Sequence, residues 1–201
     1  MATSLLEPNA RISAKADVLS EIHRAECSLA VWERPVIAGL ETLLHEGLCD
    51  LRFGCELAQF RSTLRREMIQ SGFADTPLCE RLIDDICDLA QRYSEIMALK
   101  AVEARLEIVT TDSCRKFHAD YVPARLISTY VGTGTHWLDG EDAKRVERGQ
   151  EPQRTNILGT GDVGLFKGKR STGSPAIHRS PPIAGTDETR LLLVLNPVDT
   201  I

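Results

Sequence analysis

The spacing of hydrophobic and polar residues changes near residue 100. Before that point, apolar residues recur every three or four positions, which is the period of an amphipathic helix. The pattern predicts four helices, over residues 18–25, 36–43, 57–68 and 82–96. Thr76 and Pro77 suit the cap and the first residue of the last helix. Residues 1–100 are therefore expected to form a helical support region.

After residue 100 the period becomes two. Val102, Ala104 and Leu106 alternate with charged residues, which indicates a strand with one buried and one wet face. Five more segments have strand character: residues 117–122, 124–131, 162–166, 176–179 and 190–196. The polar residues 139–156 are expected to form an inserted loop or a short helix. These features predict an α+β fold, with the helices packed on a jelly-roll-like β-barrel of residues 101–201 as one compact unit.

Composition narrows the class of protein. With 201 residues, 42% of them hydrophobic and 26% charged, the chain suits a globular protein too short for two ordinary independent domains. A net charge of -5 argues against a nucleic-acid partner. No apolar run approaches the ~20 residues that span a bilayer, and the first 15 residues lack the apolar core of a secretory signal. We therefore expect a cytoplasmic protein that does not bind membranes.

Three residues in the second part have the chemistry of metal ligands. His118 and Asp120 are two positions apart, so a strand would place an imidazole and a carboxylate on the same face. His178 lies in another strand-like segment. If the two strands are neighbours, the three side chains form a two-histidine, one-carboxylate triad that leaves other coordination positions open. The sequence therefore predicts a metal site formed by these three residues.

The order of segments around these residues resembles the iron- and 2-oxoglutarate-dependent oxygenases, which have a double-stranded β-helix fold. A strand from residue 161, a loop to His178, two prolines and a strand opened by Arg190 carry this likeness. The resemblance implies Fe(II) held by the predicted triad. It also implies 2-oxoglutarate bound through its distal carboxylate by Arg190, with Tyr130 as a second donor. A guanidinium suits that role because it is a planar fork that stays charged. Leu192 departs from the pattern, since many relatives have Ser or Thr there.

The chain as a whole is similar to the bacterial domain-of-unknown-function family 1826. The likeness is carried by CRKFHAD at residues 114–120, GTGTHWL at 132–138 and AIHRSPP at 176–182, and it extends to Trp32 and the last apolar strand. The family implies a link to metal supply, since its genes are often associated with zinc-starvation regulons and metal-handling GTPases. Such a GTPase is an expected partner. The family identifies neither a reaction nor a small-molecule or protein substrate.

Zinc offers a different interpretation of the same residues. Cys114 could join the triad in a closed, tetrahedral Zn(II) site, typical of a zinc-binding accessory protein in metal homeostasis without catalytic turnover. His136, beside Trp137, could border the site. Strand alternation is expected to turn Arg179 to the face opposite His178. The leading hypothesis remains an Fe(II)/2-oxoglutarate-type oxygenase.

Overall fold

A seven-stranded sheet runs through the computed structural model, which describes residues 9–112 and 114–198. Its strand order is β1-β2-β8-β5-β10-β4-β3. The strands are β1 (Ala10–Ser13), β2 (Leu29–Trp32), β3 (Leu51–Glu56), β4 (Ala101–Val109), β5 (Ala124–Val131), β8 (Val163–Lys167) and β10 (Arg190–Pro197). Neighbouring strands are antiparallel, apart from the parallel pair of β1 and β2.

A second, smaller sheet has the order β7-β6-β9. Its strands are β6 (His136–Trp137), β7 (Asn156–Ile157) and β9 (His178–Arg179), and an isolated bridge adds His118 beside His178. From β4 onward, the chain passes back and forth between the large and the small sheet, as in a jelly roll. Apolar side chains of both sheets meet in one cluster that includes Ile127, Trp137 and Val194. The space between the sheets is therefore a core as well as the setting of the predicted site.

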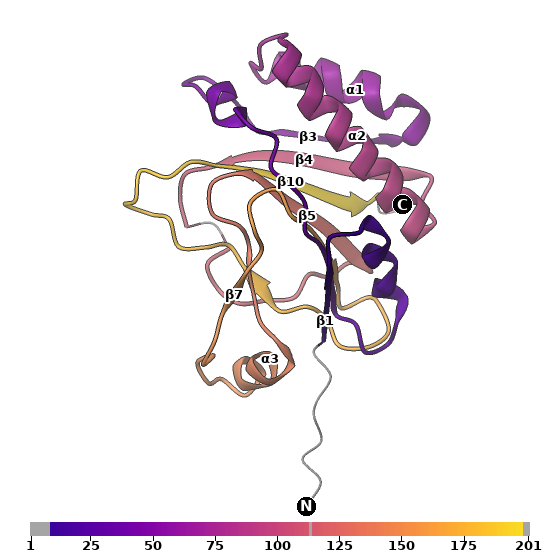
Figure 1. Ribbon diagram of the computed structural model, residues 1–201, viewed down its shortest axis with the longest axis vertical. Helices are drawn as coiled ribbons and strands as arrows, with labels where there is room; N and C mark the ends of the chain where they lie inside the picture. Colours follow the sequence, from indigo (N-terminus) through magenta and orange to yellow (C-terminus); the bar gives the residue numbers. More distant parts are fainter. Residues whose placement is uncertain (1–8, 113, 199–201) are drawn as a thin grey trace, which may run out of the picture.

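Two α-helices, α1 (Leu57–Gln70) and α2 (Pro77–Met97), lie side by side over the outer face of the large sheet (Figure 1). Buried residues of α2 share the largest apolar cluster with residues of β4 and β10. The predicted start of α2 is confirmed, because the Thr76 side chain accepts a hydrogen bond from the Cys79 amide at 3.2 Å and Pro77 is the first helical residue. The apolar stripes of these two helices thus stabilise the sheet from outside.

The first two predicted helices are not α-helices. Their places are taken by short 3₁₀ segments, η1 (Ala16–His23) and η2 (Leu40–Leu43). The helical period also gave no indication of β1, β2 and β3, which belong to the large sheet. β1 pairs with β2, β2 pairs with β8, and β3 pairs with β4. In β2, the three residues from Leu29 to Val31 are all buried, so no alternation marks the strand. Residues 1–100 are therefore not a purely helical support, and the large sheet joins both parts of the chain.

The strand pattern of the second part agrees better with the structure. β4, β5 and β10 match their predicted ranges closely, whereas the segment 117–122 contributes only the bridge at His118. The polar insertion holds a short helix, α3 (Gly140–Glu147), capped by the Asp139 side chain and located at the end of the molecule opposite α1 and α2 (Figure 1). The wet face predicted for β4 turns toward the space between the sheets, where Arg105 and Glu107 line a pocket.

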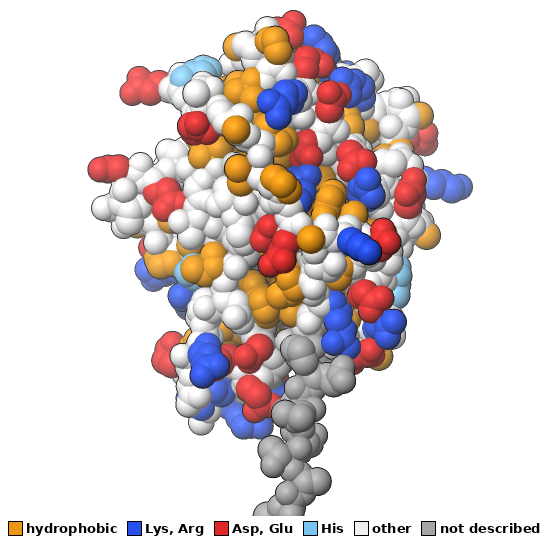
Figure 2. Space-filling view, viewed as in Figure 1, with side chains coloured by type: hydrophobic (Ala, Val, Ile, Leu, Met, Phe, Trp, Pro, Cys, Tyr) orange, Lys and Arg blue, Asp and Glu red, His pale blue; other side chains and the backbone are white. Residues whose placement is uncertain are grey.

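Charged side chains of both signs are interspersed over the face of the molecule shown in Figure 2, and none gathers into a large patch of one sign. This surface fits the small net charge of -5. Within the described ranges 9–112 and 114–198, no helix combines the length and apolar character needed to cross a bilayer.

Candidate metal centre

His118 and His178 face each other across a two-bond bridge. The amide of each donates to the carbonyl oxygen of the other, both at 2.9 Å. Such a pair places the two side chains next to each other, and the ring centroids are 4.8 Å apart. The His178 ring is buried and also contacts the Phe166 ring, with 4.8 Å between centroids, while the His118 ring is partly exposed. The backbone pairing therefore brings together two imidazoles that are far apart in the sequence.

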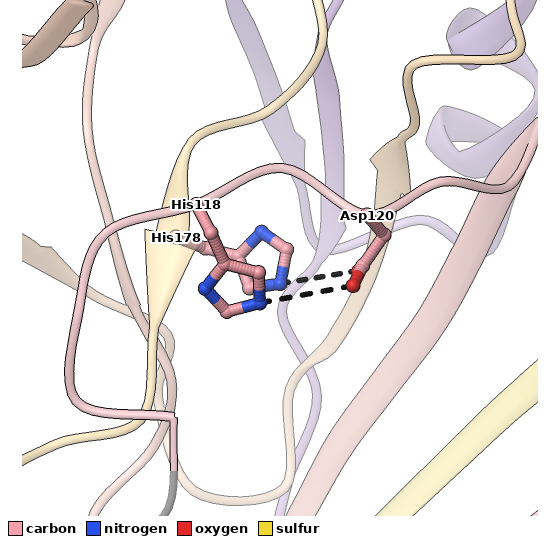
Figure 3. Close-up of side chains that lie close together, drawn as sticks. All are labelled: His118, Asp120 and His178. Carbon is pink, nitrogen blue, oxygen red and sulfur yellow. Dashed lines mark ion pairs between the residues drawn. The ribbon is translucent and has the colours of Figure 1, made fainter.

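Asp120 completes the group (Figure 3). Its Oδ2 lies 3.2 Å from Nε2 of His178, and its Oδ1 lies 3.7 Å from Nε2 of His118. One potential ligand atom from each of the three residues lies within 4.8 Å of the other two. The structure thus brings together all three residues that the sequence suggested as metal ligands.

The hydrogen bonds of the rings indicate which nitrogen is free to bind a metal. Nδ1 lies 2.9 Å from the Lys116 carbonyl oxygen in His118, and 3.2 Å from the Ala176 carbonyl oxygen in His178. A carbonyl can only accept, so in the neutral ring each Nδ1 carries the hydrogen and each Nε2 keeps its lone pair. Both lone pairs then point toward the Asp120 carboxylate. Carbonyl partners of this kind are typical of metal-binding histidines.

The carboxylate of Asp120 also fits a bound cation. Its Oδ2 is buried and has no hydrogen-bond partner among the described residues. Two acceptors 3.2 Å apart, Oδ2 and the Nε2 of His178, are unfavourable unless a positive charge lies between them. A protonated imidazole would supply that charge, and a divalent cation would supply more of it to all three side chains at once. The donor set therefore fits a metal ion.

Asp120 is held in place from the large sheet. Nη1 of Arg125 donates to Asp120 Oδ1 at 2.5 Å, and Nε of Arg125 donates to Oδ1 of Asn196 at 2.7 Å. Asn196 in turn donates through Nδ2 to Glu103 at 2.9 Å. Burial by itself raises the pKa of Asp120, but His178, Arg125 and the second histidine together outweigh it and lower this pKa below its usual value. The carboxylate is therefore charged and oriented before any metal binds.

A pocket opens between the sheets beside the three residues. Its walls include two arginines and three apolar residues of the large sheet, and one arginine of the small sheet: Arg105, Arg125, Ile127, Leu192 and Val194, and Arg179. The pocket has about 70 Å³ of free space, well above the ~10–15 Å³ that one water molecule occupies. Both histidines of the triad line it. Coordination positions that the protein leaves open would therefore face this pocket.

Arg190 lies on the same face of β10 as Leu192 and is fully buried. Its Nε donates to the Thr133 carbonyl oxygen at 2.6 Å and its Nη2 to Thr129 Oγ1 at 3.4 Å, but Nη1 has no partner among the described residues. Burial lowers the pKa of Arg190, although Glu188 and another carboxylate act in the opposite direction. A guanidinium remains charged even so, and its free N–H group is suited to an anion.

The matched family covers nearly the whole chain: residues 13–196 fit the model described as "Protein of unknown function (DUF1826)". The chain belongs to the DUF1826 family. The likeness that the sequence motifs suggested is thus confirmed. No curated protein matches this DUF1826 chain.

The solved structures that are similar to the DUF1826 chain include a prolyl-4-hydroxylase, an epimerase and HygX. A prolyl-4-hydroxylase from Pseudomonas putida has a TM-score of 0.46 and 10% identity, with 91% of this chain and 98% of the other covered. SnoN, a non-heme alpha-ketoglutarate-dependent epimerase of nogalamycin biosynthesis, has a TM-score of 0.43 and 14% identity, with 90% and 81% covered. HygX from Streptomyces hygroscopicus, solved with iron bound, has a TM-score of 0.40 and 14% identity, with 93% and 88% covered.

The structure does not bring Tyr130 to the site. The prediction that Tyr130 is a second hydrogen-bond donor to the co-substrate is therefore wrong. The Tyr130 hydroxyl donates to Asp85 Oδ2 of α2 at 2.6 Å, on the helix-covered face of the large sheet. Residues of β5 alternate, and Arg125 and Ile127 are the ones that turn toward the pocket. Burial and the neighbouring Asp85 raise the pKa of Tyr130 well above its usual value, which keeps the hydroxyl protonated.

Cys114 lines the pocket but does not join the ligand group of this DUF1826 protein. Among the described residues, only His118, Asp120 and His178 form a group of three or more potential ligands. The closed four-ligand site expected for zinc is therefore not formed. His136 pairs with Arg179 in the small sheet, and its Nδ1 is buried without a partner among the described residues.

Three arginines that line the pocket were not predicted from the sequence as residues of the site. Arg105 and Arg125 belong to strands whose alternation was readable, and a face assignment for β4 and β5 would have found both. Arg179 was expected to point away from the site, yet it lines the pocket. β9 has only two residues, so simple alternation does not fix where its side chains lead.

Proposed function

We propose that this DUF1826 protein is an Fe(II)- and 2-oxoglutarate-dependent oxygenase of a substrate not yet identified. The observation that carries the proposal is the meeting of two free imidazole Nε2 atoms with the unpartnered Oδ2 of Asp120 beside a pocket. Two histidines and one carboxylate with open positions are typical of non-haem Fe(II) oxygenases. The alternation of strands between two sheets, the path of a double-stranded β-helix, supports the same conclusion.

The residues present suit both groups that such an enzyme needs. His118, Asp120 and His178 would hold the iron, and the free Nη1 of Arg190 would bind the distal carboxylate of the keto acid. When both are bound, iron and 2-oxoglutarate would together allow oxygen to oxidise the substrate. Leu192 follows Arg190 by two positions on the same face of β10, and it gives the pocket wall an apolar surface.

Metal binding is tested first, on protein purified without oxygen and analysed for bound metals. We expect Fe(II) to be retained by the natural chain. Replacing Asp120→Asn removes a ligand charge, so the affinity should fall by more than the ~10–100-fold typical of residues that only support a ligand. Asp84→Asn, an exposed position of α2, serves as the matched control and should bind iron normally.

The co-substrate is tested on the iron-loaded protein by calorimetric titration with 2-oxoglutarate. Binding should be lost in Arg190→Gln and partly retained in Arg190→Lys, which keeps the charge but not the planar fork. Because Arg190 is fully buried, thermal unfolding of both variants is measured alongside. Unchanged keto-acid binding in a folded Arg190→Gln variant would contradict the proposal. Zinc retention that depends on Cys114, without any response to the keto acid, would favour an accessory protein instead.

A further inference from the structure

The interior of the pocket carries more positive than negative charge. Three arginines line it, against one carboxylate in its wall and one beside it: Arg105, Arg125 and Arg179 against Glu107 and Asp120. A divalent metal ion would add to this excess. A cleft of one sign with low-dielectric walls concentrates ligands of the opposite sign. The dianion 2-oxoglutarate would neutralise only part of it, so charge remains for a second anionic group.

Arg105 is one arginine whose bonding is incomplete. It stands on β4 beside Val194 of β10, and among the described residues its only ion pair is with Glu107, at 3.5 Å between Nη1 and Oε1. Its Nε is buried and has no hydrogen-bond partner among the described residues. A buried N–H group without a partner costs free energy, so it favours a ligand that accepts from it.

Arg179 has a similar free edge on the opposite side of the pocket. Its guanidinium lies over the Phe117 ring, 4.3 Å from the centroid, which fixes the plane of the fork. Its Nε is also buried without a partner among the described residues. Arg179 directly follows His178, so an anion bound here would lie next to the metal ligands. The stacked ring leaves the edge of the guanidinium, where the N–H groups point, available to that anion.

We propose that Arg105 and Arg179 form an anion-binding subsite that holds a carboxylate or phosphate group of the substrate. The inference rests on the proposed function, because it assigns the subsite to the molecule that is oxidised at the metal. Arg125 is already bound to Asp120, and Arg190 is assigned to the keto acid. The two remaining arginines are the ones with free Nε groups, and both line the pocket together with His118.

Two small probes distinguish the possible anionic groups. Methyl phosphate and acetate are titrated separately into protein loaded with Mn(II) and saturated with 2-oxoglutarate, so that no oxidation occurs. We expect at least one probe to bind, and its affinity to fall at least tenfold in both Arg105→Gln and Arg179→Gln. The Lys variants at these positions should recover part of the loss, since charge is kept. Arg81→Gln, on the exposed side of α2, should bind like the natural chain.

The outcomes separate this inference from the proposed function. The subsite is refuted, while the oxygenase proposal stands, if 2-oxoglutarate binds normally but neither probe does. It is refuted in the same way if the affinity of both probes is unchanged in Arg105→Gln and Arg179→Gln. If Arg105→Gln or Arg179→Gln abolishes 2-oxoglutarate binding, these arginines belong to the co-substrate site and the subsite is likewise refuted. If the natural chain does not bind 2-oxoglutarate at all, the proposed function fails. The same titrations on the Mn(II)-loaded protein alone then show whether the two arginines bind anions.

Discussion

Arg125 donates a hydrogen bond from Nη1 to Oδ1 of Asp120 at 2.5 Å and thereby fixes the carboxylate of the candidate metal site to the large sheet. The same guanidinium is held by Asn196, whose amide group is bound to Glu103. Because Oδ1 is occupied, Oδ2 is the oxygen left free to face His178. A carboxylate oriented in advance loses less entropy when a metal binds.

Removing this support should weaken metal binding without removing a ligand. In Arg125→Gln we expect the affinity for Fe(II) or Mn(II) to fall roughly 10–100-fold, the range seen for outer partners of metal ligands. Competition with a chromophoric chelator measures the change. Arg66→Gln is the matched control, since Arg66 is an exposed residue of α1 that forms an ion pair with its neighbour Glu67. Equal metal affinity in Arg125→Gln and the natural chain would show that Arg125 is not needed to orient the Asp120 carboxylate.

Glu103 should make the stability of the protein depend on acidic pH. Burial raises its pKa, but hydrogen bonds from Asn196 and Arg52 and the charges of Arg52 and Arg105 outweigh this, so the folded pKa is lower than the usual 4.5. A lowered pKa means that the charged form stabilises the fold above pH 4.5, and that this contribution disappears as pH falls through the folded value. Glu103→Gln should therefore cost about 1 kcal/mol near neutral pH.

Chemical denaturation at pH 7 and at several acidic values checks this dependence on Glu103. The difference between Glu103→Gln and the natural chain should shrink below pH 4.5, toward zero once the natural carboxylate is protonated. Glu46→Gln, at an exposed position, should show no comparable trend. A difference that stays constant with pH would mean that the carboxylate charge contributes nothing.

Tyr130 should matter for stability and not for the co-substrate. Its hydroxyl bonds to Asp85, which also accepts two bonds from Arg34, all beneath α2. Tyr130→Phe removes one hydrogen bond of this group, so the free energy of unfolding should fall by roughly 1–3 kcal/mol. Titration with 2-oxoglutarate should give the same affinity as the natural chain. A selective loss of keto-acid binding in a stable Tyr130→Phe variant would reverse our placement of this residue.

Gly134, in the connection between β5 and β6, should tolerate no side chain. A Cβ atom there would lie 1.7 Å from the Leu158 carbonyl oxygen, a backbone atom next to the pocket-lining Thr135. Gly134→Ala must push the β5–β6 connection away from the backbone at Leu158, and overpacking of this kind costs about 1–3 kcal/mol or more. Gly140→Ala is the control, since the nearest atom to its Cβ is 3.8 Å away. Equal unfolding midpoints for the two variants would disprove the close approach.

Local patterns in the sequence were sufficient for several elements of this protein. The alternation of β4, the apolar run of β10 and the Thr76 cap of α2 each depend on neighbouring residues alone, and the structure confirms them. η1 was mistaken for an α-helix because Val18, Ile22 and Ala25 are four and three positions apart, which suits an α-helix. Its buried residues are Leu19 and Ile22, which are three positions apart, the period of a 3₁₀ helix. β2 was overlooked because its buried residues show no alternation.

The sequence by itself determined which side chains are available as ligands and that His118 and Asp120 stay close together, since two positions separate them. Only the tertiary structure decided that His178 joins them, because the strand pairing that does so is a long-range contact. It also decided that Tyr130 lies beneath α2 and that Arg105 and Arg125 line the pocket. The surroundings of each face of a strand depend on which elements pack against it. The charge of the pocket is likewise a property of strands brought together by folding.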